Sequence, residues 1–316
     1  MQLVRGLHNL KDCHRGAVLT IGNFDGVHRG HQTILKRLVE CAAVHRVPST
    51  VMIFEPHPEE LFNAENAPAR LTRLHEKLIQ FKRLNIERVV IVKFNRQFSK
   101  QSAEEFVSDL LIEKLGVKHL IVGDDFRFGN KRQGDYQLLQ QLAKQHQFQL
   151  ESTQTLSEKN QRISSTAIRD ALAAGEMDYA EQLLARPYSM IGKVFHGDKR
   201  GRTIGFPTAN IHLHRCVSPL SGVYAVKLKL DEGTDKQTEY NGVANMGRRP
   251  TVDGTRQQLE VHLFDFNRDI YSESVVVEFM SFIRPEKKFS DFEQLKVQIS
   301  KDADCARHYF SNELIN

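Results

Sequence analysis

The stretch AVLTIGNFDGVHRGH, residues 17–31, decides the fold of the first part of the chain. Its first five residues form an apolar run that is typical of a buried strand, and residues 33–39 carry apolar side chains at helical spacing. Residues 22–31 therefore form a strand-to-helix turn with three glycines and two histidines. Glycines let a backbone approach a ligand closely, a helix N-terminus favours an anion, and histidines can become cationic donors near neutral pH. The turn predicts a phosphate site.

The composition is that of an ordinary soluble globular protein. The chain has 316 residues, of which 40% are hydrophobic and 26% are charged; this length leaves room for about two domains. No apolar run approaches the ~18 residues of a membrane helix, and the first residues lack the apolar core of a signal peptide. The four cysteines are scattered without a CxxC pair, which argues against a disulfide framework or a zinc site and favours a cytoplasmic location.

The formal net charge of +5 is mild. It suits anionic small substrates, although many proteins carry such a charge for solubility alone. Nucleic-acid binding would be better supported by a dense basic cluster, and the nearest candidate, Lys193 to Arg202, is rich in glycine instead. The sequence predicts neither a nucleic-acid partner nor a membrane partner.

Strands and helices alternate through the first part of the chain. Such alternation predicts a parallel sheet with helices on both faces, which binds ligands at the carboxyl ends of its strands. Unusual turns follow three strands, at residues 22–31, 54–58 and 123–129. The expected strands are Val18–Ile21, Thr50–Phe54, Arg88–Val92, His119–Val122 and Phe148–Glu151, and the expected helices are His31–His45, His75–Leu84, Ala103–Leu115 and Tyr136–Gln145.

The pattern changes near residue 186. Helices expected at Thr166–Ala174 and Tyr179–Leu184 lead to Arg186-Pro187, a typical boundary. Beyond it, short strand-like runs between turn residues predict a small antiparallel barrel. The expected strands are Met190–Phe195, Gly222–Leu230, Tyr240–Asn245, Gln258–Phe264 and Ser274–Phe279, followed by helices at Lys288–Ser300 and Ala303–Leu314. The domains are therefore expected at residues 1–186 and 187–316.

His28 and His31 are three residues apart and share one face of a helical turn. The functional interpretation is that they donate to phosphate oxygens and stabilise charge on a pyrophosphate leaving group. The chain has no GxxxxGK[ST] and no GxGxxG pattern, so neither a P-loop ATPase nor a dinucleotide dehydrogenase is supported. Zinc would need a third ligand, and Asp25 and His57 are not at a metal-binding spacing. The alternative is a pair of exposed surface histidines, which the glycines and the preceding strand disfavour.

A second phosphate-binding element is predicted at residues 162–169, RISSTAIR. Ser165 or Thr166 is a natural helix N-cap. Arg169 then lies in the first turn, where the helix dipole disfavours a cation. A bound phosphate would resolve this conflict, because hydroxyls, N–H groups and the arginine would all face it. The alternative is a plain capped helix with a solvated arginine.

The stretches GNFDGVHRGH, FEPHP, GDDFRFG and RISSTAIR, in this order and spacing, resemble the adenylyltransferase module of bacterial bifunctional riboflavin kinase/FAD synthetases. HRGH matches the HxGH motif of the wider nucleotidyltransferase superfamily, and SSTAIR resembles its ISSTxxR motif. The resemblance implies a Rossmann-like domain in which FMN attacks the α-phosphorus of ATP, giving FAD and pyrophosphate. The attacking phosphate oxygen is already ionised, so positioning and charge stabilisation suffice without a general base.

The family's site residues carry over to the matching positions of this chain. The resemblance implies that His28 and His31 are catalytic and bind the ATP phosphates. It implies an ATP site formed by Gly22, Phe24, Gly26, His28, His31, Arg162, Ser164, Ser165, Thr166 and Arg169, and an FMN site formed by Asp125, Phe126 and Phe128. For the two phenylalanines, the alternative is a role in the core.

A second glycine-rich stretch, residues 192–210, opens the barrel region. Glycine-rich backbone wraps phosphates through its N–H groups. Thr208 and Asn210 offer oxygen ligands of the kind that magnesium prefers and, two apart on an extended chain, point to one side. The pattern is equally typical of a turn followed by an edge strand. Glu260 lies in an alternating strand, where a carboxylate usually faces solvent but is also able to take a proton from an attacking hydroxyl.

The stretches GKVFHGDKRGRTIGFPTANI, GVYAV, GVANMGRRPT, LEVHLFDFNRDIY and FIRPEKKF resemble, in order, the riboflavin kinase module of the same family. The resemblance implies that Glu260 is the catalytic base for the riboflavin 5′-hydroxyl, that Thr208 and Asn210 bind Mg²⁺, and that Arg284 and Arg307 contact flavin. It implies an ATP site at Gly192, Gly197, Gly201, Arg202, Thr208 and Asn210. One position departs from the family's pattern: Ser272 stands where a glycine usually follows the tyrosine of DIY.

The sequence thus predicts an α/β nucleotidyltransferase domain followed by a small antiparallel β-barrel with terminal helices. The resemblance implies a bifunctional enzyme that phosphorylates riboflavin to FMN and adenylylates FMN to FAD, with ATP as co-substrate and Mg²⁺ as cofactor. Weak self-association is also expected. Two alternatives stay open. One is a chain with a single live activity, whose other module only binds ligand. The other is a flavin- or RNA-binding regulator that has kept these folds, against which the intact donor sets count.

Overall fold

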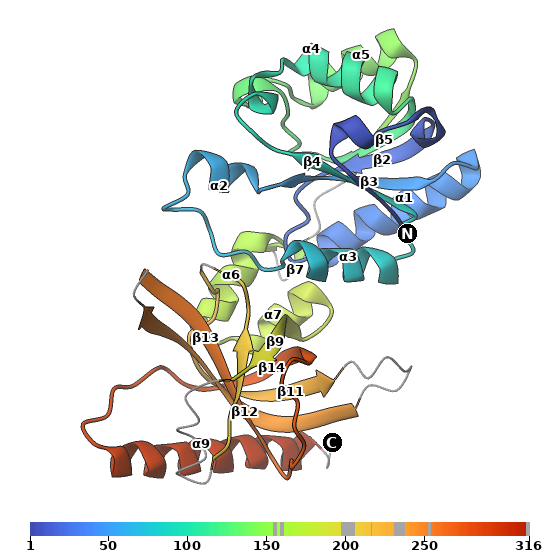
Figure 1. The fold of residues 1–316 in the computed structure, drawn as a ribbon. Coiled ribbons are helices and arrows are strands. Elements are labelled where there is room, and N and C mark those ends of the chain that lie inside the picture. The colour runs from blue at the N-terminus through green and yellow to red at the C-terminus, as the bar shows by residue number, and fades with distance from the viewer. Residues whose placement is uncertain are drawn as a thin grey trace. The chain divides into compact units, whose positions relative to one another are not determined.

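Two compact units make up the chain in the computed structural model, which describes residues 1–153, 157–158, 161–196, 206–215, 217–230, 238–251 and 254–313 (Figure 1). Unit 1 comprises Met1–Pro68 and Thr72–Ser164, and unit 2 comprises Ala69–Leu71 and Ser165–Asn316. Unit 2 therefore includes the helices α6 (Ser165–Ala174) and α7 (Met177–Leu184) together with the barrel. The domain boundary at residue 186 stays a prediction.

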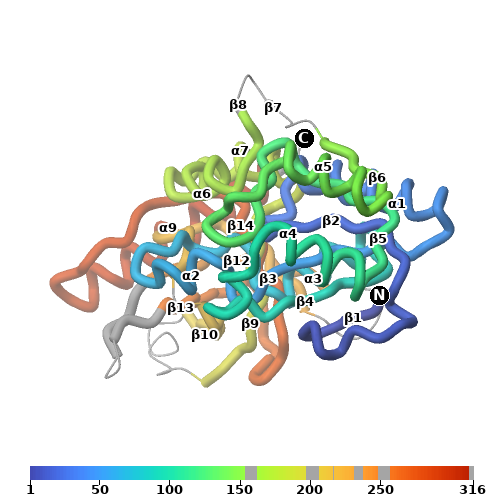
Figure 2. Tube along the Cα trace, turned by 90° about the horizontal axis from the view of Figure 1, so that it is seen from above, coloured from blue at the N-terminus to red at the C-terminus, as the bar shows by residue number. Residues whose placement is uncertain are grey.

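Unit 1 is built on a parallel sheet of six strands in the order β1-β4-β3-β2-β5-β6 (Figure 2). The five expected strands are confirmed, and β1 was not predicted. β1 has only four residues, of which only Val4 is buried, so it carries no apolar run. The strands are β1 (Gln2–Arg5), β2 (Ala17–Ile21), β3 (Ser49–Glu55), β4 (Arg88–Lys93), β5 (Val117–Gly123) and β6 (Gln149–Thr153).

Helices cover both faces of this sheet, as the alternation predicts. Successive side chains of a strand point to opposite faces of the sheet, so alternate strand residues contact the helices on each face. Val18 and Val51 pack with Leu35 of α1 (Arg29–His45) and Phe81 of α3 (Leu74–Arg83). On the other face, the core is formed by Leu19, Met52, Leu111 of η4 (Phe106–Lys114) and Leu139 of α5 (Tyr136–His146).

One expected helix of unit 1 has a different geometry. Instead of a single α-helix over residues 103–115, α4 (Ala103–Glu105) continues directly into η4, which is π-helical. The wider winding is visible at its end, where the Leu115 N–H donates to the Leu110 carbonyl at 3.1 Å. Apolar periodicity predicts a helix here, but it does not distinguish these windings.

Unit 2 contains a closed antiparallel barrel in the order β10-β13-β12-β11-β14-β9. A strand does follow the glycine-rich stretch, but the interpretation of it as an edge strand is wrong, because β10 pairs with both β9 and β13. Closure removes the exposed strand edge. The strands are β9 (Tyr188–Phe195), β10 (Ala209–His212), β11 (Gly222–Leu230), β12 (Thr238–Thr251), β13 (Gly254–Leu263) and β14 (Ser274–Arg284).

One continuous helix, α9 (Phe292–Glu313), stands where two terminal helices were expected. It packs across β11, β12 and β14, and Ala306 and Phe310 are buried against Val223 and Val243 (Figure 1). The polar segment between the two expected helices contains Asp302, which is buried in an ion pair with β14 and does not end the helix.

The short segment Ala69–Leu71 is held in unit 2 by hydrogen bonds to its carbonyl groups. The Tyr188 hydroxyl donates to the Leu71 carbonyl at 3.0 Å, and the Arg215 guanidinium donates to the Arg70 carbonyl at 2.6 Å. α7 packs against β9 and β14. These contacts explain why α6, α7 and residues 69–71 share a unit with the barrel.

Ser272, the position that departs from the family's pattern, has a φ of +66°. A left-handed backbone favours glycine, so the serine is strained there. The turn is nevertheless kept, because the Ser272 N–H donates to the Val194 carbonyl at 2.9 Å. The departure therefore adds local strain without removing the turn.

We expect Gly192→Ala to destabilise the barrel by about 1–3 kcal/mol through overpacking. A Cβ at Gly192 would meet the Ile211 side chain and lie 2.8 Å from the His212 carbonyl oxygen, so β9 and β10 would have to separate. Denaturant unfolding followed by circular dichroism measures the change. The exposed neighbour Lys193→Ala is the control and should leave stability nearly unchanged. Equal stability of the two variants would contradict this packing argument.

Candidate active sites

The strand order of unit 1 brings two of the predicted loops to one edge. β2 pairs with β3 on one side and with β5 on the other, all in parallel. The chain moves from β2 to β3 and β4, and later to β5 and β6 on the other side, so the order reverses beside β2. Ligands bind at the carboxyl ends of strands at such a reversal. The turn after β2 and the loop after β5, which carries Asp125, both begin there.

Polar contacts from the segment around α3 hold the turn after β2. The buried Asp25 accepts from Thr72, at 3.0 Å from the backbone N–H and 3.3 Å from the hydroxyl. The Gly26 N–H donates to the same Thr72 hydroxyl at 2.9 Å, and the buried Lys77 ammonium donates to the Asn23 carbonyl at 2.8 Å. Single polar residues give no sequence signal, so the roles of Thr72 and Lys77 were missed.

Two residues of this turn adopt backbone conformations that favour glycine. Phe24 has a φ of +48° and Val27, which is β-branched, a φ of +42°. Such strain persists only where surrounding contacts enforce it, and it clusters at functional sites. Phe24 is 3% exposed, and its ring contacts His31 at a centroid distance of 5.1 Å. The buried Phe24 ring of the turn therefore holds the His31 ring in place.

His28 is the N-cap of α1, which explains why the helix begins at Arg29 and not at His31. Its Nδ1 accepts a hydrogen bond from the His31 backbone N–H at 3.3 Å. Because Nδ1 accepts, the proton of the neutral ring is on Nε2. His28 thus offers an N–H donor from its other edge. Gly30 permits this geometry, since a Cβ there would lie 3.2 Å from the His28 ring.

The imidazole rings of His28 and His31 are stacked, with centroids 3.6 Å apart and planes inclined by 20°. Burial lowers the pKa of His31 well below its ordinary value, and His28 and Lys77 lower it further. The His31 Nδ1 is buried without a hydrogen-bond partner. The sequence suggested a cationic donor here, but His31 is neutral in the ligand-free chain. A phosphate would supply the missing partner and favour the charged form.

The second predicted phosphate element lies mainly in unit 2, whose main segment begins at Ser165. α6 begins at Ser165, so its capping position falls at Ser164, one or two residues before the expected caps Ser165 and Thr166. Arg169 consequently lies in the second turn. Its Nε donates to the Ala69 carbonyl at 2.7 Å, so the backbone already fixes part of its guanidinium.

Arg162 and Asp125 form an ion pair with each other. Both side chains are more than half exposed, so the pair contributes little to stability and exchanges readily for ligand contacts. The sequence assigned them to different ligands, and the structure brings them together within unit 1.

A run of phenylalanine contacts extends from the surface of unit 1 into its core. Neighbouring ring centroids are 5.6 to 6.3 Å apart. The run is Phe62, Phe94, Phe54, Phe98, Phe106, Phe128 and Phe126, in order of contact. Phe128 is 6% exposed and packs in the core, as the alternative interpretation had it, whereas Phe126 is partly buried. A planar apolar ligand finds an aromatic surface at the outer members.

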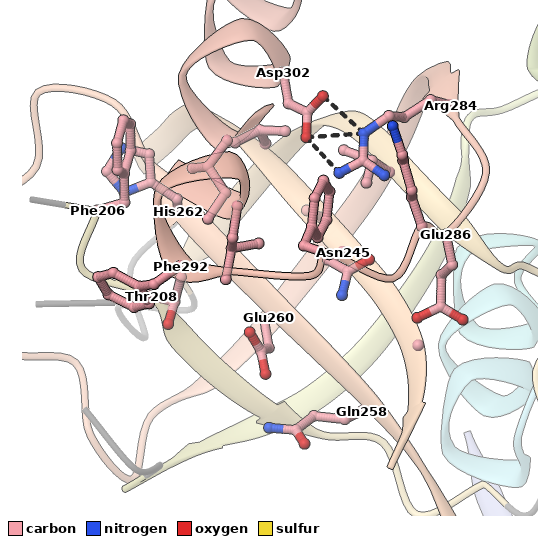
Figure 3. A pocket seen from close by; sticks show the side chains of 18 residues that line it. Phe206, Thr208, Asn245, Gln258, Glu260, His262, Arg284, Glu286, Phe292 and Asp302 are labelled. Carbon is pink, nitrogen blue, oxygen red and sulfur yellow. Dashed lines mark hydrogen bonds and ion pairs between the residues drawn. The ribbon is translucent and has the colours of Figure 1, made fainter. Parts of the chain in front are cut away.

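In unit 2, a cavity of about 470 Å³ lies between the outer face of the barrel and α9 (Figure 3). Glu260 projects from the outer face because its neighbours Leu259 and Val261 are fully buried inside. Thr208, Glu260 and Arg284 are the predicted residues that line the cavity. Apolar lining comes from Phe206, Phe289, Phe292, Leu295 and Ile299.

A row of polar side chains crosses three strands beside this cavity, which Asn245, Gln258 and Glu260 line and the buried Asn210 does not. Glu260 of β13 is the register partner of Asn210 on β10 and of Asn245 on β12, so all three lie on one face. The Gln258 amide donates to Asn210 Oδ1 at 2.7 Å. Figure 3 shows the Glu260 carboxylate between Thr208 and Asn245. Asn245 and Gln258 were missed. Alternation along β13 puts Gln258 on the same face as Glu260, but only the pairing of β12 with β13 places Asn245 beside it.

His262 attaches the Pro207 segment to the barrel. Its Nδ1 donates to the Pro207 carbonyl at 2.9 Å, and its ring packs against Phe206 at 5.2 Å. Burial lowers the pKa of His262. A neutral His262 therefore positions the residues that lead into Thr208.

The two arginines predicted to contact flavin have different surroundings. Arg284 lies in the cavity wall and holds the buried Asp302 through its Nε and Nη2, at 2.7 to 3.1 Å. Arg307 is half exposed; it pairs with Asp265 at 3.1 Å and stacks over Phe264 at 4.3 Å. Of the predicted kinase ATP site, Gly197, Gly201 and Arg202 lie outside the described residues.

The geometry defines a class of enzyme. Unit 1 presents a histidine pair at the switch point of a parallel sheet, and unit 2 is a closed barrel with a carboxylate in a cavity, which together are typical of a two-module nucleotide-dependent transferase. Residues 10–167 match the FAD synthetase family model, and residues 184–310 match the riboflavin kinase model.

Named relatives match nearly the whole chain. The chain is 51% identical over 312 residues to the bifunctional riboflavin kinase/FMN adenylyltransferase of Haemophilus influenzae, covering 99% of this chain and 100% of the relative. It is 50% identical to the Escherichia coli K12 enzyme of the same name, covering 98% of both chains. The chain therefore belongs to the bifunctional riboflavin kinase/FMN adenylyltransferase family.

A solved structure confirms the fold. A crystal structure from Streptococcus pneumoniae, described as a macrolide-efflux protein, is 29% identical with a TM-score of 0.81, covering 97% of this chain and 99% of that chain. That description differs from the names of the relatives with higher identity, which are riboflavin kinase/FMN adenylyltransferases. Among the described residues, no helix is long and apolar enough to cross a membrane.

We expect the protein to lose stability as the pH falls below about 6.5, the ordinary pKa of histidine, in part because of His31. The lowered pKa means that the unfolded chain binds a proton that the folded chain refuses, so protonation favours unfolding in that range. His31→Gln should therefore show a shallower loss of stability with falling pH. Denaturant unfolding followed by circular dichroism at several pH values measures the slope.

The matched control is His8→Gln, which replaces an exposed histidine. It should keep the slope of the unmodified protein. An unchanged slope in His31→Gln would mean that His31 is not the group responsible.

Proposed function

We propose that the two modules catalyse successive reactions: unit 2 transfers the γ-phosphoryl group of ATP to riboflavin, and unit 1 transfers AMP from a second ATP to the FMN formed. Family membership over nearly the whole chain supports both reactions. The observation that carries the division of labour is chemical. The cavity of unit 2 contains a carboxylate beside oxygen ligands, whereas the turn of unit 1 presents two stacked imidazoles.

In the adenylyl transfer, an ionised phosphate oxygen of FMN forms a bond to the α-phosphorus of ATP while the bond to pyrophosphate breaks. His28 donates through Nε2–H, and His31 takes up a proton from solvent when the phosphates bind and then also donates to them. Because charge moves onto pyrophosphate, donors aimed at the phosphates stabilise the transition state more than the ground state. The strained turn and its contacts to Thr72 and Lys77 hold this pair in place before substrate binds.

The remaining polar residues of the adenylyltransferase site act as binding groups in this proposal. Gly22 and Gly26 keep the backbone close to the nucleotide. Ser164, Ser165, Thr166, Arg162 and Arg169 hold the triphosphate. Asp125 and Phe126 contribute to the FMN side, and Phe128 supports the Phe126 ring from the core. The exposed Arg162–Asp125 pair supports ligand exchange at this position, since it is weakly held.

In the phosphoryl transfer, Glu260 accepts the proton of the riboflavin 5′-hydroxyl as its oxygen bonds to the γ-phosphorus and ADP leaves. Magnesium fits the oxygen donors of Thr208 and Asn210, and the Gln258 amide orients the Asn210 side chain. When bound, Mg²⁺ supplies positive charge to the ATP phosphates. Gly192 is better supported as a packing residue of β9 than as a phosphate contact.

Flavin binding in the kinase module follows from the apolar wall of the cavity. Phe206, Phe289 and Phe292 offer surfaces for the isoalloxazine ring. Arg284 borders the same space, but its charge is balanced by Asp302, so we assign it to shaping the wall. Arg307 lies against Phe264 and is a weaker candidate. Weak self-association and a cytoplasmic location stay predictions.

The assay that tests the whole proposal incubates the purified protein with riboflavin and MgATP and separates the flavins by chromatography. FAD formation is the expected result. FMN alone would mean a silent adenylyltransferase module, and unchanged riboflavin would favour the alternative of a flavin- or RNA-binding regulator.

We expect His28→Ala combined with His31→Ala to lower the rate of FAD formation from FMN by at least about 10²-fold, the typical effect of removing one transition-state donor. Riboflavin phosphorylation is the internal control and should be unchanged, because the pair lies in unit 1. An equal loss of both activities in a folded variant would contradict the division of labour.

We expect Glu260→Gln to lower the rate of FMN formation by about 10²–10⁴-fold, the usual contribution of a general base. Gln keeps the shape of the side chain but accepts no proton. Conversion of supplied FMN to FAD should persist. If this variant phosphorylated riboflavin normally, Glu260 would not be the base.

A further inference from the structure

A second cluster of ligand-bearing side chains lies in unit 1, away from the histidine turn. Cys41 of α1, His119 of β5 and Glu151 of β6 each offer one ligand atom, and these atoms lie within 4.8 Å of one another. Cys41 is ten residues beyond His31 on α1, which places it about 15 Å further along the helix axis. The scattered cysteines gave no metal-binding spacing, because these three residues meet only through the fold.

We infer that Cys41, His119 and Glu151 form a structural site for a divalent cation of the Zn²⁺ type. Thiolate, imidazole and carboxylate are the ligand types that zinc combines. Around a tetrahedral zinc ion, ligand atoms lie roughly 3.5 Å apart, so the cluster needs only a small contraction. The site would add a metal link between α1, β5 and β6, beside the ion pair that already joins Arg37 of α1 to Glu151 of β6.

One nitrogen of the buried His119 ring has no hydrogen-bond partner, and the other lies near Glu151. The His119 residue is 6% exposed, and its Nδ1 is buried without a hydrogen-bond partner, which is rare for a polar atom in a core. Its other nitrogen, Nε2, lies 3.6 Å from Glu151 Oε2, beyond hydrogen-bond distance. The ring of His45, one turn beyond Cys41 on α1, lies 5.6 Å from the His119 ring. The fourth position is therefore open to His45 or to water.

Arg37 opposes the cation in the ligand-free chain. Its guanidinium binds both carboxylate oxygens of Glu151, at 2.7 and 3.0 Å. Each carboxylate oxygen keeps a second lone pair, so Glu151 is able to bind a cation without releasing Arg37. Cys41 is buried and carries its thiol proton, which passes to solvent when the metal–sulfur bond forms. The positive charge of Arg37, which does not itself bind the metal, thus lowers the affinity of the site for a cation.

The test uses the metal-free full-length protein titrated with Co²⁺ and, separately, with Zn²⁺ in competition with a chromophoric chelator. We expect a thiolate-to-cobalt absorption band, one bound Zn²⁺ per chain and a melting temperature that rises with Zn²⁺. Cys41→Ala should abolish the band and the shift in melting temperature. The control, Cys13→Ser with Cys305→Ser, removes two exposed cysteines and should keep both.

Two further variants keep the inference falsifiable if Cys41→Ala fails to fold. Glu151→Gln should keep the cobalt–thiolate band but weaken Zn²⁺ binding, whereas Arg37→Gln should tighten it, each within the roughly 10–100-fold range of changes around a metal site. Arg37 is about half exposed, so its variant should fold. A band that persists in folded Cys41→Ala, a band that disappears in the Cys13/Cys305 control, or weaker binding in Arg37→Gln would overturn the inference.

Discussion

The parallel pairing of β2 with β3 on one side and β5 on the other is the constraint on which unit 1 depends. Parallel strands end at the same edge, so this pairing fixes where the chain after β2 and the chain after β5 emerge. After the turn that follows β2, α1 begins at Arg29, and His28 caps its N-terminus. The same residue is thereby fixed in one tautomer. Sheet register, helix capping and donor direction are consequences of one arrangement.

Much of this could be predicted from the sequence, because apolar periodicity reports burial directly. All five expected strands of the parallel sheet exist, and the turn after β2 contains the stacked histidines. β1 escaped prediction because an edge strand with one buried residue has no periodicity to detect. The break expected within α9 had the opposite cause: Asp302 appears as a polar interruption in the sequence, but Arg284 neutralises it in the core.

The sequence was less informative about what holds the sites. Thr72 and Lys77 support the histidine turn from a segment about fifty residues away, and only the fold brings them there. In the barrel, Asn245 and Gln258 lie beside Glu260 through strand register, which depends on pairing rather than on local composition. The protonation state of His31 was also beyond the sequence, since burial, His28 and Lys77 together lower its pKa. Motifs identify the groups that meet substrate, while long-range contacts decide their charge and direction.

In the mechanism that we propose, the two sites solve different electrostatic problems with different residues. A hydroxyl nucleophile must lose a proton, so the barrel places a carboxylate in its cavity and keeps the nearby Arg284 charge occupied by Asp302. A phosphate nucleophile is already ionised, and a carboxylate beside it would repel both substrates. Unit 1 accordingly buries Asp25 beneath the turn, where Thr72 holds it, and leaves the imidazoles to meet the phosphates. The barrel thus places the charge of Glu260 where it helps the reaction, whereas unit 1 keeps the charge of Asp25 away from the phosphates.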